Sequence, residues 1–146
     1  MADISEDINY TFLDDRFKAF VNIKYTYSWL SSKEVEFYKP FAISPQQYNI
    51  LRILRGAGER IKVQVVKDRM IERAPNATRL MDKLLEKNFI TRSRCNNDRR
   101  VVYVDITENG LSLLAEIDKY MDQLNYLNKL SEEEAKQLSD LLDKIR

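Results

Sequence analysis

The chain has 146 residues, of which 44% are hydrophobic and 32% charged, a composition typical of one folded domain and not of a disordered segment. Its formal net charge is +1, histidine is absent and cysteine occurs once, so an internal disulfide is excluded and the commonest general base and metal ligand is missing. The lack of a Gly-rich phosphate loop and of a G-x-S-x-G motif also weighs against an enzyme, so we expect no catalytic residue, cofactor or metal.

The chain begins with the acidic stretch M-A-D-I-S-E-D-I-N, which lacks the basic and apolar regions of a secretory signal. No apolar run in the sequence is long enough to span a bilayer. Together with the single cysteine, these features favour a cytoplasmic protein without membrane contact.

An aromatic-rich segment, about residues 8–37, comes next and predicts a helix. Apolar residues recur there at intervals of three and four, the spacing of one helix face: Leu13, Phe17, Phe20, Ile23, Tyr27 and Leu30. Pro40 disfavours helical backbone at the residue before it and predicts where this helix ends.

A second helix is predicted from a complete start signal. Ser44 is expected to be the N-cap, Pro45 the first helical residue and Gln47 the third position of a capping box. Gly56 or Gly58 is expected to end this helix.

Two more helices are predicted before residue 89. The shorter, about residues 62–70, turns Val63, Val66 and Met70 inward. The other, residues 74–88, has Pro75 in its first turn and Asn88 in left-handed backbone after its end. Its buried stripe is expected to be Ala77, Leu80, Met81 and Leu84.

A β-hairpin and two helices complete the predicted order. The strands are residues 89–94 and 100–106, and Thr107 is expected to cap the long helix that follows. Along that helix an apolar seam recurs at intervals of three and four: Leu114, Ile117, Met121 and Leu124. We interpret it as a dimer interface, the alternative being a core within the chain. A capping box formed by Ser131 and Glu134 predicts the last helix.

Positive charge is concentrated in the middle of the chain. Residues 60–100 hold 12 Lys or Arg against 5 Asp or Glu, a local charge of +7, while the remainder holds 12 against 18. A basic centre on an almost neutral chain is typical of a module that binds a polyanion.

The order short helix, turn, amphipathic helix and basic hairpin predicts a winged helix-turn-helix in a mainly α chain. In the helix of residues 74–88, Asn76, Arg79 and Lys83 share the exposed face. Together with Thr78 they are expected to read base edges in a major groove. The wing is expected to enter a minor groove through an arginine, whereas phosphate contacts are expected from Arg73, Lys87, Arg92 and Arg99.

Asp98 is expected to orient Arg100 as the minor-groove probe, the alternative being an ion pair that only stabilises the turn. The whole predicted set of DNA-binding residues is Arg73, Pro75, Asn76, Thr78, Arg79, Lys83, Arg92, Asp98, Arg99 and Arg100.

The stretch N-A-T-R-L-M-D-K-L-L-E-K-N-F-I-T-R-S-R-C-N-N-D-R-R-V-V-Y-V-D-I-T-E-N-G resembles the multiple-antibiotic-resistance regulator (MarR) family. The residues that match its pattern are Thr78, Arg79, Leu80, Asp82, Leu84, Arg92, Asp98, Arg100, Ile106, Thr107 and Gly110. The stretches I-S-P-Q-Q-Y-N-I-L-R-I-L and K-L-S-E-E-E-A-K-Q-L-S-D-L-L resemble two further helices of that family, so the likeness covers most of the chain.

The resemblance implies a homodimer that binds pseudo-palindromic double-stranded DNA, usually as a repressor relieved by a small-molecule effector. It also implies dimerisation helices at about residues 1–40 and 108–146 around a DNA-binding part at about residues 44–106. The effector is expected between these parts, where Tyr25, Tyr27 and Trp29 are our candidate pocket residues, although such aromatic segments more often form dimer core.

Two positions depart from the family pattern. Asn88 stands in place of the usual glycine, which its tolerance of left-handed backbone permits. The peroxide-sensing branch has a reactive cysteine in its first helix, whereas the single thiol here, Cys95, lies in the hairpin turn. It is expected to be an exposed turn residue, the alternative being a thiol whose pKa Arg94 and Arg99 lower and that senses oxidants. The alternative function is a winged-helix adaptor that binds proteins and not DNA.

Overall fold

The computed structural model describes residues 3–73 and 75–146. Its elements, in order, are α1 (Ile4–Asp7), α2 (Asp15–Tyr38), the 3-10 helix η1 (Lys39–Phe41), α3 (Pro45–Ala57), β1 (Ile61–Lys62), α4 (Val63–Arg69), α5 (Ala77–Glu86), β2 (Ile90–Arg94), β3 (Val102–Ile106), α6 (Glu108–Asp118), the 3-10 helix η2 (Met121–Leu124) and α7 (Glu132–Lys144). This is the mainly α chain with a winged helix-turn-helix that the sequence predicts.

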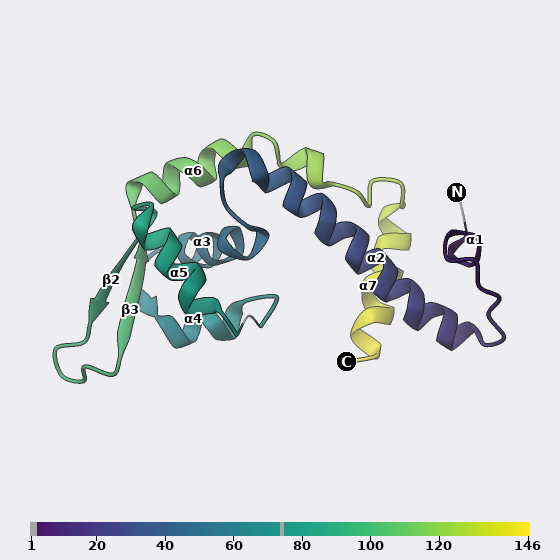
Figure 1. The fold of residues 1–146 in the computed structure, drawn as a ribbon, viewed down its shortest axis with the longest axis horizontal. Coiled ribbons are helices and arrows are strands. Elements are labelled where there is room, and N and C mark those ends of the chain that lie inside the picture. The colour runs from purple at the N-terminus through teal and green to yellow at the C-terminus, as the bar shows by residue number, and fades with distance from the viewer. Residues whose placement is uncertain (1–2, 74) are drawn as a thin grey trace.

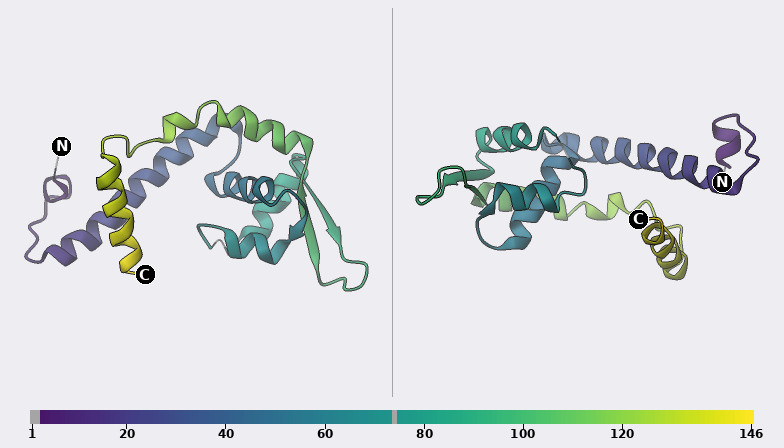
Figure 2. Two further views of the ribbon diagram at one scale, coloured as in Figure 1. Left: turned by 180° about the vertical axis from the view of Figure 1, so that it is seen from behind. Right: turned by 90° about the horizontal axis from the view of Figure 1, so that it is seen from below.

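Helices α3, α4 and α5 and the sheet form one part of the molecule, and α2 runs from it toward the end that carries α1 and α7 (Figure 1). Turned by 90°, α2 is seen as one uninterrupted rod between these two parts (Figure 2). The core lies in the first part, where Ile50, Leu51, Leu54, Met81 and Leu84 have no exposed surface.

Helix α2 begins later than the sequence predicts. The side chain of Asp14 accepts a hydrogen bond from the backbone N–H of Arg16 at 3.0 Å and starts the helix at Asp15. Leu13, which the apolar spacing placed inside the helix, therefore precedes it and is fully exposed. The short helix α1, capped by Asp3, was not predicted, since four residues are too few for a periodic pattern.

Helix α3 confirms its predicted start and end. Ser44 and Gln47 form the complete capping box, with Pro45 as the first helical residue. Gly58 ends the helix with φ +68°, a left-handed conformation that glycine adopts without a steric penalty.

The wing belongs to a three-stranded antiparallel sheet of order β1-β3-β2. Residues 90–94 of β2 pair with residues 102–106 of β3, so β3 starts two residues later than predicted. Strand β1 was not predicted; its two residues pair Ile61 with Val104 and Lys62 with Tyr103. We name β2, β3 and the connecting residues 95–101 the wing.

Helix α5 begins at Ala77, with Asn76 as its N-cap, so the prediction that Pro75 lies in its first turn is wrong. Pro75 instead forms part of the turn before the helix, and Ala74 lies outside the described residues. Asn88 has φ +59°, which confirms the predicted left-handed backbone.

Helix α6 corrects the predicted dimer seam. It ends at Asp118, and Leu114 and Ile117 are completely buried in this chain's own core. Met121 and Leu124 belong to η2 and pack against the same core. The seam is therefore intramolecular, because α6 and η2 cover the winged part of the chain.

The start of α6 is pressed against the base of the wing. Thr107 caps the helix by accepting from the backbone N–H of Gly110 at 3.1 Å. A Cβ atom on Gly110 would lie 2.4 Å from the carbonyl oxygen of Phe89 and 2.6 Å from the side chain of Ile106, so glycine is required by this close approach.

Candidate nucleic-acid interface

A concave surface lies between α4, α5 and the wing, with a recess of about 400 Å³. Its charged and polar walls are Lys62, Gln64, Lys67, Thr78, Arg92, Arg94 and Arg100, which together we name the basic groove. The described residues that line it include five cations and no carboxylate. Such a surface concentrates positive potential where a polyanion can approach.

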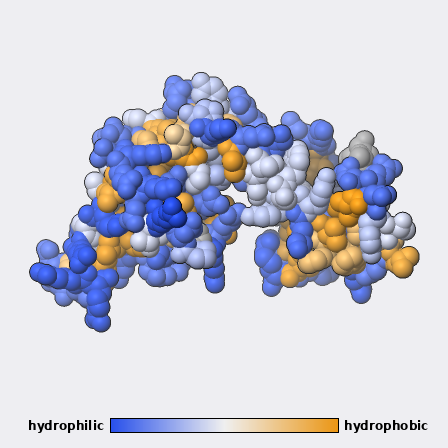
Figure 3. Space-filling view, viewed as in Figure 1, coloured by the Kyte–Doolittle hydropathy of each residue, from blue (hydrophilic) through white to orange (hydrophobic). Residues whose placement is uncertain are grey.

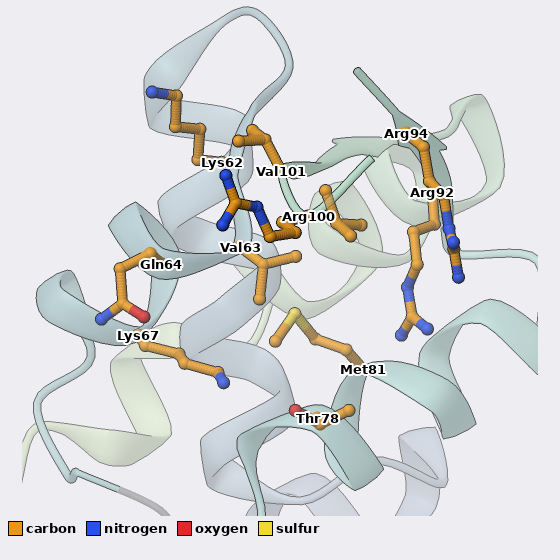
Figure 4. A pocket seen from close by; sticks show the side chains of 11 residues that line it. Lys62, Val63, Gln64, Lys67, Thr78, Met81, Arg92, Arg94, Arg100 and Val101 are labelled. Carbon is orange, nitrogen blue, oxygen red and sulfur yellow. The ribbon is translucent and has the colours of Figure 1, made fainter. Parts of the chain in front are cut away.

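The side chains of the basic groove come from several elements (Figure 4). Lys67 extends from α4 toward Thr78 on α5, while the side chains of Arg92 and Arg94 project from β2. Lys62, Lys67 and Arg94 were not among the predicted contacts. The local charge of residues 60–100 includes all three, but only the packing of α4 against the wing places them together.

The exposed face of α5 carries the residues predicted to read base edges. Thr78, Arg79 and Lys83 are exposed, whereas Ala77, Met81 and Leu84 hold the opposite face in the core. Asn76 is exposed at the N-cap, and its side chain makes no capping hydrogen bond, which leaves the amide available. Arg73 and Pro75 are exposed in the segment before the helix.

At the wing tip Asp98 forms hydrogen bonds with the backbone and the side chain of Arg100. One oxygen of its carboxylate accepts from the backbone N–H of Arg100 at 3.0 Å and from its Nε at 3.2 Å. These bonds, the backbone one foremost, hold the pKa of Asp98 below its usual range. The Arg100 side chain nevertheless stays 91% exposed, so the pair directs the guanidinium outward without covering it.

Arg92 has a partner within the chain. Its Nη2 lies 2.6 Å from the carboxylate of Asp82 on α5, and its side chain is 28% exposed. The ion pair joins the wing to α5 beside the basic groove. A guanidinium engaged in this way links two neighbouring elements, and the predicted phosphate contact of Arg92 stays a prediction.

The other predicted phosphate contacts differ in their surroundings. Arg99 is exposed in the wing turn. The ammonium group of Lys87 donates a hydrogen bond to the backbone carbonyl of Ala42, and Lys87 does not line the basic groove. The wing turn also contains Cys95, half-buried, whose backbone N–H donates to Val101 at 2.9 Å.

A second cavity, of about 350 Å³, lies between α2, α3, η2 and the loop from Met70 to Glu72, and we name it the inter-helix cavity. None of the predicted effector residues lines it: Tyr25, Tyr27 and Trp29 are 44%, 56% and 44% exposed on α2. Trp29 packs edge-on against Tyr126, with ring centroids 5.2 Å apart. Tyr27 reaches the edge of the cavity because its hydroxyl donates to Glu72.

Within the described residues, no three His, Cys, Asp or Glu side chains are grouped so that they could hold a metal ion. The described helices also include none that is both long and apolar enough to cross a membrane.

Comparison with known proteins gives one consistent picture. The MarR family profile matches residues 43–102. The chain is 25% identical over 130 residues to the HTH-type transcriptional regulator MhqR of Bacillus subtilis (strain 168), covering 88% of this chain and 89% of that one. It is 32% identical in sequence to a MarR transcription factor from Planctomyces limnophilus of known crystal structure. The two structures superpose with a TM-score of 0.71, over 91% of this chain and 98% of that one. A mutant MarR from E. coli in complex with operator DNA has the same fold, with 22% identity, a TM-score of 0.78 and coverage of 92% and 99%.

Proposed function

The chain belongs to the MarR family of transcriptional regulators, and on that premise we propose that it is a homodimeric repressor that binds a pseudo-palindromic operator and is released by a small ligand. The basic groove is the observation that carries this proposal. Its five cations surround a recess next to the exposed face of α5, and three of them, Lys62, Lys67 and Arg94, can neutralise phosphates beside an inserted helix.

In the proposed complex, α5 enters the major groove and presents Asn76, Thr78, Arg79 and Lys83 to base edges. Arg100 enters the adjacent minor groove, directed by Asp98. Arg73 and Arg99 bind phosphates, and Pro75 shapes the turn that brings α5 to the DNA. Lys62, Lys67 and Arg94 join the phosphate contacts because they line the basic groove.

Dimerisation is supported by apolar surface at the end of the molecule that carries both termini. In α2, Phe17, Phe20 and Ile23 are 48%, 56% and 42% exposed, and Leu141 in α7 and Ile145 just after it are 62% and 69% exposed. Figure 3 shows hydrophobic surface gathered at that end. Apolar surface of this extent favours a partner. We assign the dimer contacts to α2 and α7, within the expected ranges 1–40 and 108–146, and leave α6 to the core.

Release by a ligand is supported by the position of the inter-helix cavity. It lies between α2, which we assign to the dimer, and the loop that leads into α5. A ligand there contacts both parts and can therefore change how α5 is presented to DNA.

The test uses duplex DNA that the purified protein selects from a random-sequence pool. We expect a selected site with two related half-sites about one helical turn apart. Its affinity should fall on the order of a thousandfold between about 50 and 200 mM salt, because several phosphates are neutralised. Absence of DNA binding at low salt would contradict the proposal and favour a protein-binding adaptor.

A further inference from the structure

The inter-helix cavity has apolar and aromatic walls. Tyr38 and Tyr48 stack there with ring centroids 4.7 Å apart, and both are almost completely buried. Met121 and Leu124 of η2 and Met70 of the loop complete the apolar part. A cavity of this size and lining can hold a small organic molecule.

Two carboxylates line the same cavity, Glu34 from α2 and Glu72 from the loop. Within the described residues, neither forms an ion pair with a lysine or arginine. In the part of the chain that the structure describes, Glu72 accepts hydrogen bonds only from neutral donors, the hydroxyl of Tyr27 and Nε2 of Gln46, the latter at 2.9 Å. Partial burial and then the charge of Glu72 raise the pKa of Glu34, so the two groups repel each other.

Arg52 also lines the cavity, but it acts on the tyrosines. Burial raises the pKa of Tyr38 and of Tyr48, and the positive charge of Arg52 opposes the rise in both. One guanidinium and two carboxylates leave the lining of the cavity with a net negative charge, and neither carboxylate has a cation among the described ion pairs.

We propose that the inter-helix cavity binds an organic monocation with an apolar body, its positive charge between Glu34 and Glu72 and its body against Tyr38 and Tyr48. This inference rests on the proposed function, since it names the class of ligand that releases the regulator. A cation relieves the repulsion between the two carboxylates and is attracted by aromatic faces, whereas an anion meets like charge.

Glu72 also provides a route from the cavity to α5. Its carboxylate ties the loop to α2 through Tyr27 and to α3 through Gln46, four residues before the N-cap Asn76. A bound cation draws the same carboxylate into the cavity, in competition with Tyr27 and Gln46. The loop then moves relative to α2 and α3, which changes the presentation of α5 and weakens DNA binding.

Calorimetry on the full chain tests the ligand class with two probes of similar size and opposite charge, benzyltrimethylammonium and benzylsulfonate. We expect the cation to bind at least about tenfold more tightly than the anion, and Glu34→Gln to remove most of that preference. Glu36→Gln is the matched control, because Glu36 lies two residues away on α2, pairs with Lys33 and does not line the cavity. Equal affinity for the two probes, or a cation affinity that Glu34→Gln leaves unchanged, would overturn the proposal.

The coupling to DNA is tested with Tyr27→Phe, which removes one donor to Glu72. Since Glu72 is then freer to turn toward the cavity, we expect tighter binding of benzyltrimethylammonium, by about threefold, and release of DNA at lower concentrations of the cation. Unchanged affinity and unchanged release would refute the role of Glu72.

The DNA measurements separate this inference from the proposed function. Selected duplex DNA that stays bound at saturating benzyltrimethylammonium refutes the regulatory inference and leaves the proposed DNA binding intact. Failure of the ligand-free protein to bind duplex DNA refutes the proposed function. The preference for the cation is measured by calorimetry in the absence of DNA, so that failure does not affect it.

Discussion

The guanidinium of Arg92 on β2 lies 2.6 Å from the carboxylate of Asp82 on α5, so the wing and α5 are joined by a direct ion pair. Both side chains remain partly exposed, at 28% and 49%, and such a pair contributes about 0.2–1 kcal/mol to folding stability. Its larger effect is expected on geometry, because it links the two elements that we propose to enter neighbouring grooves.

Asp82→Ala distinguishes the two roles of Arg92. If Arg92 positions the wing, loss of Asp82 lowers DNA affinity, by about threefold to tenfold, although it removes a negative charge from the interface. If Arg92 is a phosphate contact, the same change frees the guanidinium and raises the affinity. Fluorescence anisotropy with the selected duplex measures the difference, and a rise would contradict the positioning role.

Arg100→Ala should weaken DNA binding by about 1–3 kcal/mol, since Arg100 is the proposed minor-groove probe. The folded state should be affected by less than about 0.5 kcal/mol, because the side chain is 91% exposed. Lys129→Ala, at an exposed lysine in the segment before α7, is the control for lost charge. A variant that binds DNA as tightly as the unmodified protein would show that Arg100 makes no groove contact.

Lys62→Ala and Lys67→Ala test the phosphate contacts of the basic groove that the sequence did not predict. Each substitution should make the slope of log affinity against log salt concentration less steep, by about 0.9 for each phosphate contact that a protomer loses. The loss should be similar for selected and unrelated duplexes, because phosphates carry no sequence information. An unchanged slope would exclude the residue from the interface.

The Asp98 carboxyl should titrate below the ordinary aspartate value of about 3.9. Because the folded pKa is lowered, the stabilisation of the wing turn is present above the unfolded pKa and is lost as pH falls through the folded pKa. Arg100→Ala should return the pKa only partly, since the backbone N–H of residue 100 is the larger cause and remains. Carboxyl NMR of the two proteins measures this; a complete return would assign the shift to the guanidinium.

Phe20→Asp should convert the proposed dimer into a monomer, because it places a charge in exposed apolar surface of α2. Light scattering coupled to size-exclusion chromatography measures the mass. Ile71→Asp, at a residue 81% exposed in the loop before α5, is the control and should leave the mass unchanged. A dimer that survives Phe20→Asp would move the interface away from this face.

The helices with chemical signals at both ends were predictable from the sequence. Ser44, Gln47 and Gly58 define α3 because capping and left-handed backbone depend on local residue types. Strand β1 was missed because two residues cannot show alternation, and its pairing with β3 is set by packing across 40 residues of chain.

Periodicity also could not identify the partner of an apolar face. The spacing of Leu114, Ile117, Met121 and Leu124 predicts a packed face, but our assignment of that face to a dimer interface is wrong, because it packs within its own chain. The exposed residues of α2 have the same kind of spacing and remain uncovered. The spacing is alike in both cases because it indicates an apolar helix face. It does not indicate whether the same chain or a partner covers that face.

The functional site was predictable where neighbouring residues form it. Asp98 and Arg100 are two residues apart, so their pairing follows from the turn itself. Asp82 and Arg92 meet only because β2 packs beside α5, and the inter-helix cavity combines residues between Glu34 and Leu124. No local pattern contains that information. The predicted pocket residues Tyr25, Tyr27 and Trp29 were chosen for their aromatic character, and none of them lines this cavity.

Helix α2 is continuous over 24 residues and therefore spans about 36 Å. One end is fixed to the winged part near Tyr38, and the other carries the apolar face proposed to contact a second chain. A tilt of about 5° at one end displaces the other by about 3 Å over that length. In the proposed dimer, such a tilt would change the separation of the two α5 helices relative to the pitch of the duplex, so we expect α2 to convert a small rearrangement into a mismatch with the operator.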